Sequence, residues 1–401
     1  MEGHKLTIAV IALGHWSAAL TNGAMRVVLP VYYAAAGESI SKIALLFFLF
    51  KLAEVVAPMG MGLTLNRIGY KRTFVSALGI HTLISCFYLF PVSALVFLER
   101  FVRGVVYMSD MSAVYVKHFS VRETQRFLVN MILGLKEASK GVGMALGGLL
   151  LTVCTLQNTV LVFAAVTATS TLTAVRFLPD LKEQTRTPVR KIWRTVDSKI
   201  KTLGLGFGLL HGALDAWGVV LLPVYLSTEF GLSPAVIGAV MMGQYVFHGV
   251  VVTVFSRYVN IPADGRTVLL TSALALIAVS LSLSVPLSLY PFLALVFFYL
   301  FLFSISMVYY NHLRLEFASE TQTSLDLAAF TTLSNVVKPI AVLASGLLAE
   351  SLGSSWSYYF ASLLTLFSAL SCLWLPGSAA RSSALLGAYE TGSTIIKSPG
   401  R

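Results

Sequence analysis

The stretches LPVYYAAAGES, at residues 29–39, and LPVYLSTEFGLS, at residues 222–233, share their first four letters. Each one ends a long apolar run, contains a polar turn, and precedes a new apolar run that begins at Ile43 or at Ile237. The two copies are 193 residues apart in a chain of 401 residues. This spacing predicts a chain that is built from two related halves.

The composition excludes an ordinary soluble domain. Hydrophobic residues make up 56% of the chain and charged residues 12%, whereas a soluble domain has about 25% charged residues. Apolar runs long enough to cross a bilayer core of about 30 Å recur along the whole chain. We expect twelve membrane-spanning helices, at residues 6–34, 43–64, 73–90, 92–116, 127–152, 159–178, 202–226, 234–256, 267–285, 290–312, 324–349 and 355–375. The prediction is an all-α membrane protein of two pseudo-symmetric six-helix bundles.

Lysine and arginine gather in the loops on one side of the predicted bundle, and the opposite loops contain a single lysine, Lys42. Cytoplasmic loops carry such an excess of positive charge, so we expect both termini in the cytoplasm. The predicted organisation is a bundle at 1–178, a basic linker at 179–201, a bundle at 202–375 and a cytoplasmic tail at 376–401. The net charge of +11 is spread over short loops and therefore indicates no nucleic-acid partner.

Charged residues inside the predicted spans follow a pattern. The spans at 73–90, 159–178, 267–285 and 355–375 have none except at their ends, so these helices are suited to face lipid. The segment GLKEASKGVGMALGG at 134–148, in contrast, carries three charges inside an apolar run. Charges at that depth are costly unless they face a polar cavity. The remaining helices are therefore predicted to enclose one.

Two motifs resemble those of the major facilitator superfamily. GLTLNRIGYKR at 62–72 is similar to its loop motif Gly-x-x-x-Asp-Arg-x-Gly-Arg-Lys, and RFVRG at 100–104 is similar to its fourth-helix motif Arg-x-x-x-Gly. The resemblance implies two bundles that rock about a central site. It also implies a cytoplasmic gate motif at Gly62, Asn66, Arg67, Gly69 and Lys71. Asn66 replaces the motif's aspartate, and Met144 replaces the proline of the antiporter motif, which favours import over drug/proton antiport.

Several cations are candidates for contact with an anion. Lys136 and Lys140 share one helical stripe with two glycines, although Lys136 could also extend toward the cytoplasmic end. Arg26 shares a stripe with Asn22 and needs an anionic partner, either a fixed carboxylate or the substrate. Arg103 either pairs internally with Glu99 at i,i+4 or contacts the solute. The predicted substrate-binding residues are Asn22, Arg26, Arg103, Lys136, Lys140, Tyr299, Tyr310 and Lys338.

A second group of residues is suited to proton coupling. Asp215 lies 193 residues after Asn22, which is the repeat offset, and His211 precedes it by one helical turn. Buried carboxylates bind protons more readily than exposed ones, and Arg100 matches the arginine that the resemblance links to coupling. The predicted coupling residues are Glu54, Arg100, Glu137, His211 and Asp215. We predict no metal site and no cofactor.

The predicted function is secondary active transport of a small polar anion, a carboxylate or carboxylate-type siderophore, by proton-coupled import. Cations exceed acids by two in the first-half spans, and an anionic solute would complete this balance. Proton-driven export of a metabolite or drug is the alternative. A non-transporting sensor or an intramembrane enzyme would need features that the sequence lacks, such as a Gly-x-Ser-x-Gly motif. We expect a monomer in a bacterial inner membrane.

Overall fold

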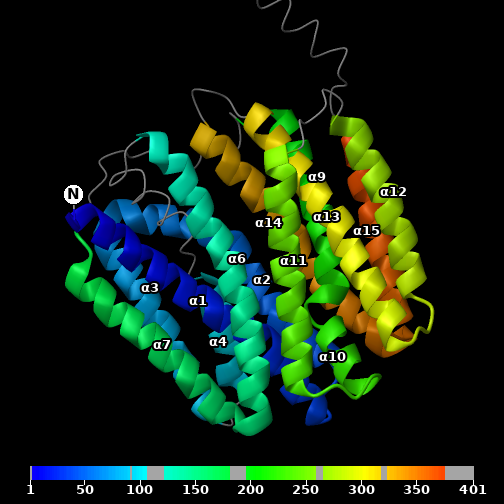
Figure 1. Ribbon diagram of the computed structural model, residues 1–401, viewed down its shortest axis with the longest axis horizontal. Coiled ribbons are helices and arrows are strands. Elements are labelled where there is room, and N and C mark those ends of the chain that lie inside the picture. The colour runs from blue at the N-terminus through cyan, green and yellow to red at the C-terminus, as the bar shows by residue number, and fades with distance from the viewer. Residues whose placement is uncertain are drawn as a thin grey trace, which may run out of the picture.

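The computed structural model describes residues 2–90, 93–105, 122–180, 196–258, 265–317 and 323–374 (Figure 1). Within these ranges every regular element is a helix, as the long apolar runs predict. Nine of the helical segments in this part of the chain are long and apolar enough to cross a membrane. Others, such as α2 and α6, carry several charged residues. The protein is an all-α membrane protein.

The described residues of the first half form six helices and one short 3-10 turn. They are α1 (Glu2–Ala35), α2 (Ile40–Ile68), α3 (Tyr70–Ser85), η1 (Cys86–Leu89), α4 (Ser93–Val105), α6 (Arg122–Val153) and α7 (Leu156–Phe177). Helix α1 runs on through Pro30. The first-half spans predicted from the sequence coincide with these helices, and α4 covers its predicted span as far as residue 105.

The second half repeats this order with one difference. Its helices are α9 (Ser198–Gly218), α10 (Leu221–Thr228), α11 (Pro234–Tyr258), α12 (Gly265–Leu283), α13 (Leu289–Phe317), α14 (Thr323–Leu352) and α15 (Ser355–Leu373). The chain leaves α9 at Gly218 and enters α10 at Leu221, so the counterpart of α1 is broken into two helices. The boundaries of the linker and the tail remain predictions, because residues 181–195 and 375–401 lie outside the described ranges.

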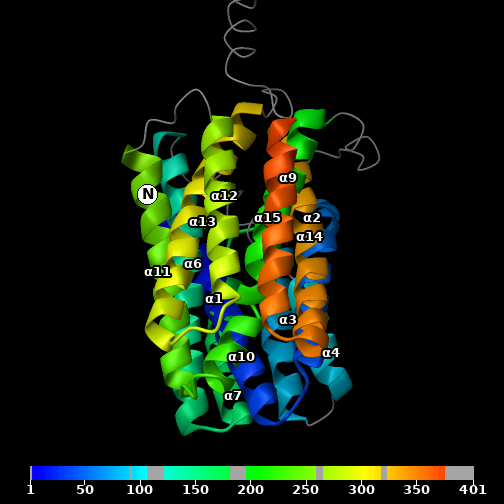
Figure 2. The ribbon, with the colours of Figure 1, turned by 90° about the vertical axis from the view of Figure 1, so that its right-hand side faces the viewer.

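The same packing pattern holds in both halves (Figures 1 and 2). Helix α1 packs against α6 and α7, α2 against α4, and α3 against α7. In the second half α9 packs against α14 and α15, α11 against α13, and α12 against α15. Between the halves α6 packs against α11, and α2 packs against α14. The fold is therefore a parallel repeat whose halves meet along two helix pairs.

Glycines allow close approach of α1 and α6. A β-carbon at Gly23 would clash with the carbonyl oxygen of Lys140, and one at Gly143 would clash with that of Leu20. Small residues at such spacing let helix backbones touch in a membrane. The glycines on the lysine stripe of α6 therefore fix this helix against α1, with Lys140 held at the contact.

The two halves also touch closely at the end of the molecule where α6 and α14 finish. A β-carbon at Gly148 would clash with the carbonyl oxygen of Pro234, and one at Gly346 would clash with the side chain of Ala44. The Glu350 carboxylate accepts a hydrogen bond of 2.8 Å from the backbone N–H of Ser41. This end, which the basic-loop pattern predicts to be non-cytoplasmic, is closed by close contacts between helices of the two halves.

Candidate functional site

A cavity of about 330 Å³ lies between the two halves. Its volume falls in the range of about 300–1,000 Å³ that is usual for ligand sites. The lining comes from α1, α2 and α6 in the first half and from α9, α11, α13 and α14 in the second. Its charged side chains are Arg26, Lys51, Glu54, Lys136, Glu137, Lys140, Asp215, Arg314 and Lys338.

The cavity extends from the middle of the molecule toward one end. Arg26 lies well inside α1, whereas Arg314 is near the end of α13 and Phe330 is near the start of α14. The close glycine contacts of α6 with α11 and of α2 with α14 lie at the opposite end. The site is therefore covered on one side by helix contacts and reaches toward the side of the basic loops.

The three carboxylates of the cavity are bound by lysines. The Lys51 ammonium lies 3.1 Å from Asp215 of the other half and 3.4 Å from Glu54 of its own helix. The Lys140 ammonium hydrogen-bonds both Glu137 oxygens, at 2.8 and 2.9 Å. The Lys51–Asp215 pair thus joins the halves, while the Lys140–Glu137 pair lies within α6.

Other cations of the cavity have neutral partners. Arg26 donates a 2.6 Å hydrogen bond to the Tyr245 hydroxyl, and Lys338 donates one of 3.0 Å to the Asn335 side-chain carbonyl. The Gln244 side-chain nitrogen is buried and has no hydrogen-bond partner among the described residues. Six cations and three carboxylates line the described cavity, so it carries a formal excess of three positive charges. Such a set of donors is suited to an anionic solute.

Two predicted site residues belong to a separate group of charges, the α4 cluster, which we define as Glu99, Arg100 and Arg103. The Glu99 carboxylate accepts hydrogen bonds from Arg100 at 2.6 and 2.9 Å, and it also pairs with Arg103. Arg103 donates a further bond of 2.8 Å to the Ser85 hydroxyl. These side chains are completely buried among α2, α3, η1 and α4 and are not among the described lining of the cavity. The structure does not bring Arg100 and Arg103 to the other candidates.

Three further candidates lie beside the cavity lining rather than in it. The Tyr310 hydroxyl is within 3.0 Å of the Ser368 hydroxyl, which ties α13 to α15. The Tyr299 ring packs edge-on against Trp217, with ring centroids 5.1 Å apart. Asn22 is half-buried on α1, outside the described lining. The structure brings together Arg26, Glu54, Lys136, Glu137, Lys140, His211, Asp215 and Lys338.

The predicted gate motif lies between α2 and α3. Gly69 has a positive φ of 87°, which glycine adopts without strain, and it precedes the first turn of α3, where Lys71 lies. Gly62, Asn66 and Arg67 fall in the last turns of α2, and their side chains are outside the described part of the structure. Their role at the gate stays a prediction.

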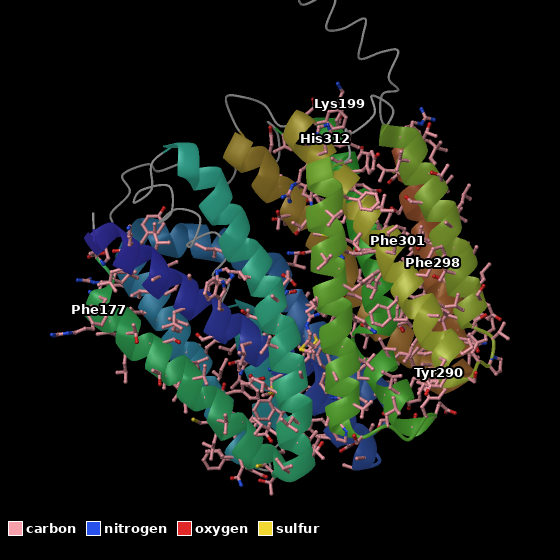
Figure 3. All side chains as sticks on the ribbon, in the orientation of Figure 1. Phe177, Lys199, Tyr290, Phe298, Phe301 and His312 are labelled. Atoms are coloured by element: carbon pink, nitrogen blue, oxygen red, sulfur yellow. The ribbon has the colours of Figure 1, made fainter. Side chains whose placement is uncertain are left out.

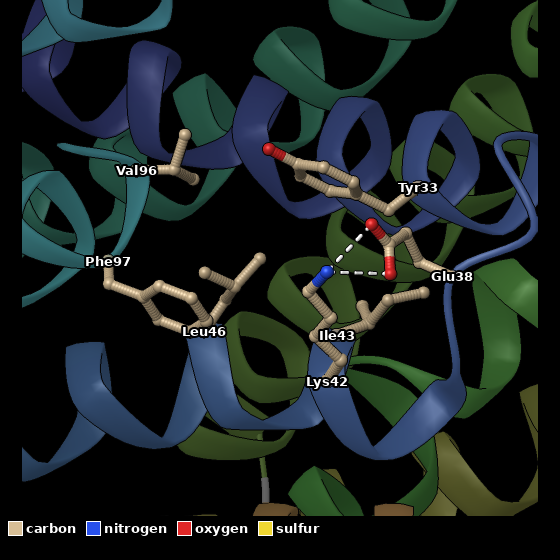
Figure 4. A pocket seen from close by; sticks show the side chains of 7 residues that line it. All are labelled: Tyr33, Glu38, Lys42, Ile43, Leu46, Val96 and Phe97. Carbon is tan, nitrogen blue, oxygen red and sulfur yellow. Dashed lines mark hydrogen bonds and ion pairs between the residues drawn. The ribbon is translucent and has the colours of Figure 1, made fainter. Parts of the chain in front are cut away.

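A second, much smaller cavity lies between α1, α2 and α4 near the closed end (Figure 4). Its volume is about 20 Å³, close to the roughly 10–15 Å³ that one water molecule needs. At its rim the Lys42 ammonium hydrogen-bonds both Glu38 oxygens at 2.7 Å. This cavity is too small for an organic solute, so the large cavity is the candidate transport site.

Sequence reasoning missed one whole side of the large cavity. Gln244, Tyr245 and His248 form a polar patch at i, i+1 and i+4 on α11, and this spacing was a detectable signal. Phe303 and Phe330 also line the cavity, but the chain has 25 phenylalanines and nothing in the sequence separates these two from core residues.

The comparison with protein families decides what kind of protein carries this cavity. The sequence profile of the Major Facilitator Superfamily matches residues 11–309. The chain belongs to this superfamily. The family resemblance predicted from the two motifs is thus confirmed, and the protein is a multi-pass membrane transporter of a small solute rather than an enzyme.

Solved structures of other superfamily transporters have the same fold. A mutant of the nucleoside transporter NupG aligns with a TM-score of 0.72 at 13% identity, over 92% of this chain and 99% of its own. The human organic anion transporter MFSD10 (TETRAN) aligns with a TM-score of 0.69 at 14% identity, over 92% and 99%. No curated protein matches the sequence. At these identities the likeness shows the fold of a Major Facilitator Superfamily member.

Proposed function

We propose that this transporter carries a small polar organic anion, a carboxylate or a carboxylate-type siderophore, by alternating access. The observation that carries the proposal is the charge of the cavity, whose described lining has three more cations than carboxylates. Arg26 and Lys338 bind neutral oxygens, so each has donors to offer to a carboxylate. Arginine supplies a two-pronged contact and lysine a point charge.

Transport is proposed to be coupled to protons and directed inward. Glu54, Glu137 and Asp215 are the carboxylates of the cavity, and each is within 4.0 Å of a lysine ammonium. Protonation of Asp215 would weaken its pair with Lys51, which is an ionic contact between the halves. A proton can thereby change how firmly the two halves are held together.

The orientation of the chain follows from the basic loops. We infer cytoplasmic termini, so the cavity reaches toward the cytoplasm and the closed end faces outward. We also propose that the protein is a monomer in a bacterial inner membrane. In this arrangement the structure corresponds to an inward-facing state.

Uptake into proteoliposomes tests the proposed function. The probes are radiolabelled mono- and dicarboxylates, with their neutral amides and the matching alkylamines as controls for size. We expect saturable uptake of one or more carboxylates, accumulation when the lumen is alkaline, and loss of accumulation with a protonophore. Preferential uptake of an amine would overturn the anion assignment. Carboxylate uptake that ignores both pH and the protonophore would overturn the coupling and indicate a uniporter.

A further inference from the structure

Several aromatic side chains line the second-half side of the large cavity, among aliphatic and polar residues. Five of them are Phe207 and His211 of α9, His248 of α11, Phe303 of α13 and Phe330 of α14, which we call the aromatic wall. These five rings come from four different helices of the second half. The folded chain gathers them on the same cavity as the cationic side chains of α1, α2 and α6.

The rings of the aromatic wall are ordered against one another. His211 lies edge-on to Phe207, with centroids 4.4 Å apart, and edge-on to Phe303, at 4.9 Å. Phe207 stacks on Phe330 at 5.3 Å, and His248 lies 5.7 Å from Phe303. Spacings of 4.5–7 Å in edge-on or offset arrangements are those that favour aromatic contacts. A planar ring in the cavity would extend this network.

The aromatic wall adjoins the ionic pairs directly. His211 precedes Asp215 by four residues on α9, a rise of about 6 Å along the helix. Phe330 and Lys338 lie two helical turns apart on α14 and both line the cavity. A ligand that contacts both the aromatic wall and the charged side chains must therefore carry a ring and a charged group close together.

Polar groups near the wall are available to a ligand. His211 borders the cavity, and its ring contacts Phe207 and Phe303. The buried Gln244 side-chain nitrogen, on α11, has no hydrogen-bond partner among the described residues. Gln244 and His211 both line the cavity, so a bound solute can reach their polar groups.

Resting on the proposed anion transport, we propose that the preferred solute is an aromatic carboxylate. Its carboxylate contacts Arg26, Lys140 or Lys338, and its planar ring packs against Phe207, His211 and Phe303. Aromatic pairs add roughly 2- to 12-fold in affinity beyond the burial of area. We expect the aromatic acid to be preferred over a saturated acid of the same charge and similar size by a factor in this range.

Binding to the purified full-length transporter tests the proposal. Benzoate and cyclohexanecarboxylate are compared by isothermal titration calorimetry, since the two acids have equal charge and carbon number but only benzoate is planar and aromatic. Benzoate is expected to bind at least about 2-fold more tightly. Phe303→Leu should lower the affinity for benzoate more than that for cyclohexanecarboxylate, so that the preference disappears.

A matched control comes from the same helix. Phe298 is 49% exposed and stacks on Phe301 at 6.5 Å, on the outer surface of α13 (Figure 3). Phe298→Leu makes the same chemical change away from the cavity, and the benzoate preference should persist. Should Phe303→Leu fail to fold, Phe207→Leu replaces it, because Phe207 also lines the cavity.

The outcomes separate the aromatic proposal from the proposed function. Equal binding of the two acids by the wild type, with both lost in Lys140→Met, would overturn the aromatic proposal and leave anion transport standing. A benzoate preference that Phe303→Leu and Phe207→Leu both leave intact would also overturn it. Failure of both acids to bind, together with no carboxylate uptake, would overturn anion transport and the aromatic proposal with it.

Discussion

The α4 cluster and the α6 pair of Glu137 and Lys140 are both ionic groups on helices of the first half, yet their surroundings differ. The Glu99 side chain is 0% exposed and has a hydroxyl and two guanidinium groups as fixed partners. Lys140 and Glu137 are 14% and 34% exposed and border open space. A charge within a span is therefore structural when protein groups surround it, and available to a solute when it borders a cavity.

Neutralising the α4 cluster should have the largest effect on stability. Glu99→Gln would leave Arg100 and Arg103 buried without a counter-charge. Breaking a buried ion pair in this way costs about 3–5 kcal/mol. We expect a large fall in the melting temperature of the protein in detergent, or failure to purify as a monodisperse species.

Glu137→Gln is the matched control, since it makes the same substitution at a partly exposed carboxylate of the cavity. Its melting temperature should stay near that of the wild type. Similar melting temperatures for Glu99→Gln and the wild type would show that the α4 cluster contributes no more to stability than the cavity charges do.

Removing a cavity lysine should affect transport rather than folding. Lys140→Met loses one of the charged contacts to the solute, and hydrogen bonds to charged groups contribute about 1.5–3 kcal/mol, which is roughly 10- to 100-fold in affinity. We expect carboxylate uptake to fall by this factor, while the protein still reaches the membrane and melts normally. Normal uptake would mean that Lys140 serves only as the partner of Glu137.

A variant of Asp215, which pairs with Lys51 across the two halves, is expected to lose proton coupling while it still binds substrate. Asp215→Asn removes the ion pair with Lys51 and makes the cavity more positive. Substrate exchange across proteoliposomes should continue, whereas accumulation driven by a pH gradient should be lost. Counterflow and gradient-driven uptake measure these two properties separately. If Asp215→Asn still accumulates substrate, Asp215 is not the residue that binds the coupled proton, and Glu54 or Glu137 becomes the candidate.

The pair at the rim of the small cavity should have the smallest effect. Lys42 and Glu38 lie at i,i+4 with side chains that are 43% and 34% exposed, and such surface pairs contribute about 0–1 kcal/mol. Lys42→Gln should therefore leave both the melting temperature and the uptake close to those of the wild type. A substantial loss of uptake would show that this outer pair takes part in the transport cycle.

The fold was largely predictable because it depends on patterns that are local in the sequence. Apolar runs give the helices, and the repeated LPVY stretch gives the two halves. The helical stripe of Lys136 and Lys140 also predicted that they would share a face. The side chains that these residues contact on distant helices could not be predicted in this way. The spacing along one helix shows which face a side chain is on, but not which residue of another helix lies opposite.

The candidate site shows this limit in two places. Arg26 was expected to need a carboxylate or a substrate, and it binds the Tyr245 hydroxyl, 219 residues away. Arg103 lies on a polar face of its helix, but it also hydrogen-bonds His81 and Ser85 of α3, which hold it away from the cavity. The aromatic wall depends on four helices, and phenylalanine is too common in this chain to indicate it.

The glycine at position 148 has a consequence for trapping the transporter in another conformation. The space beside it is filled by the backbone of Pro234, so even a methyl group requires α6 and α11 to move apart at the closed end. A bulky side chain there acts as a wedge, which penalises the closed arrangement without touching any charged residue. A single bulky substitution at this buried position would therefore favour the conformation in which the closed end is open. Such a variant could be used to crystallise that conformation or to select antibodies against it.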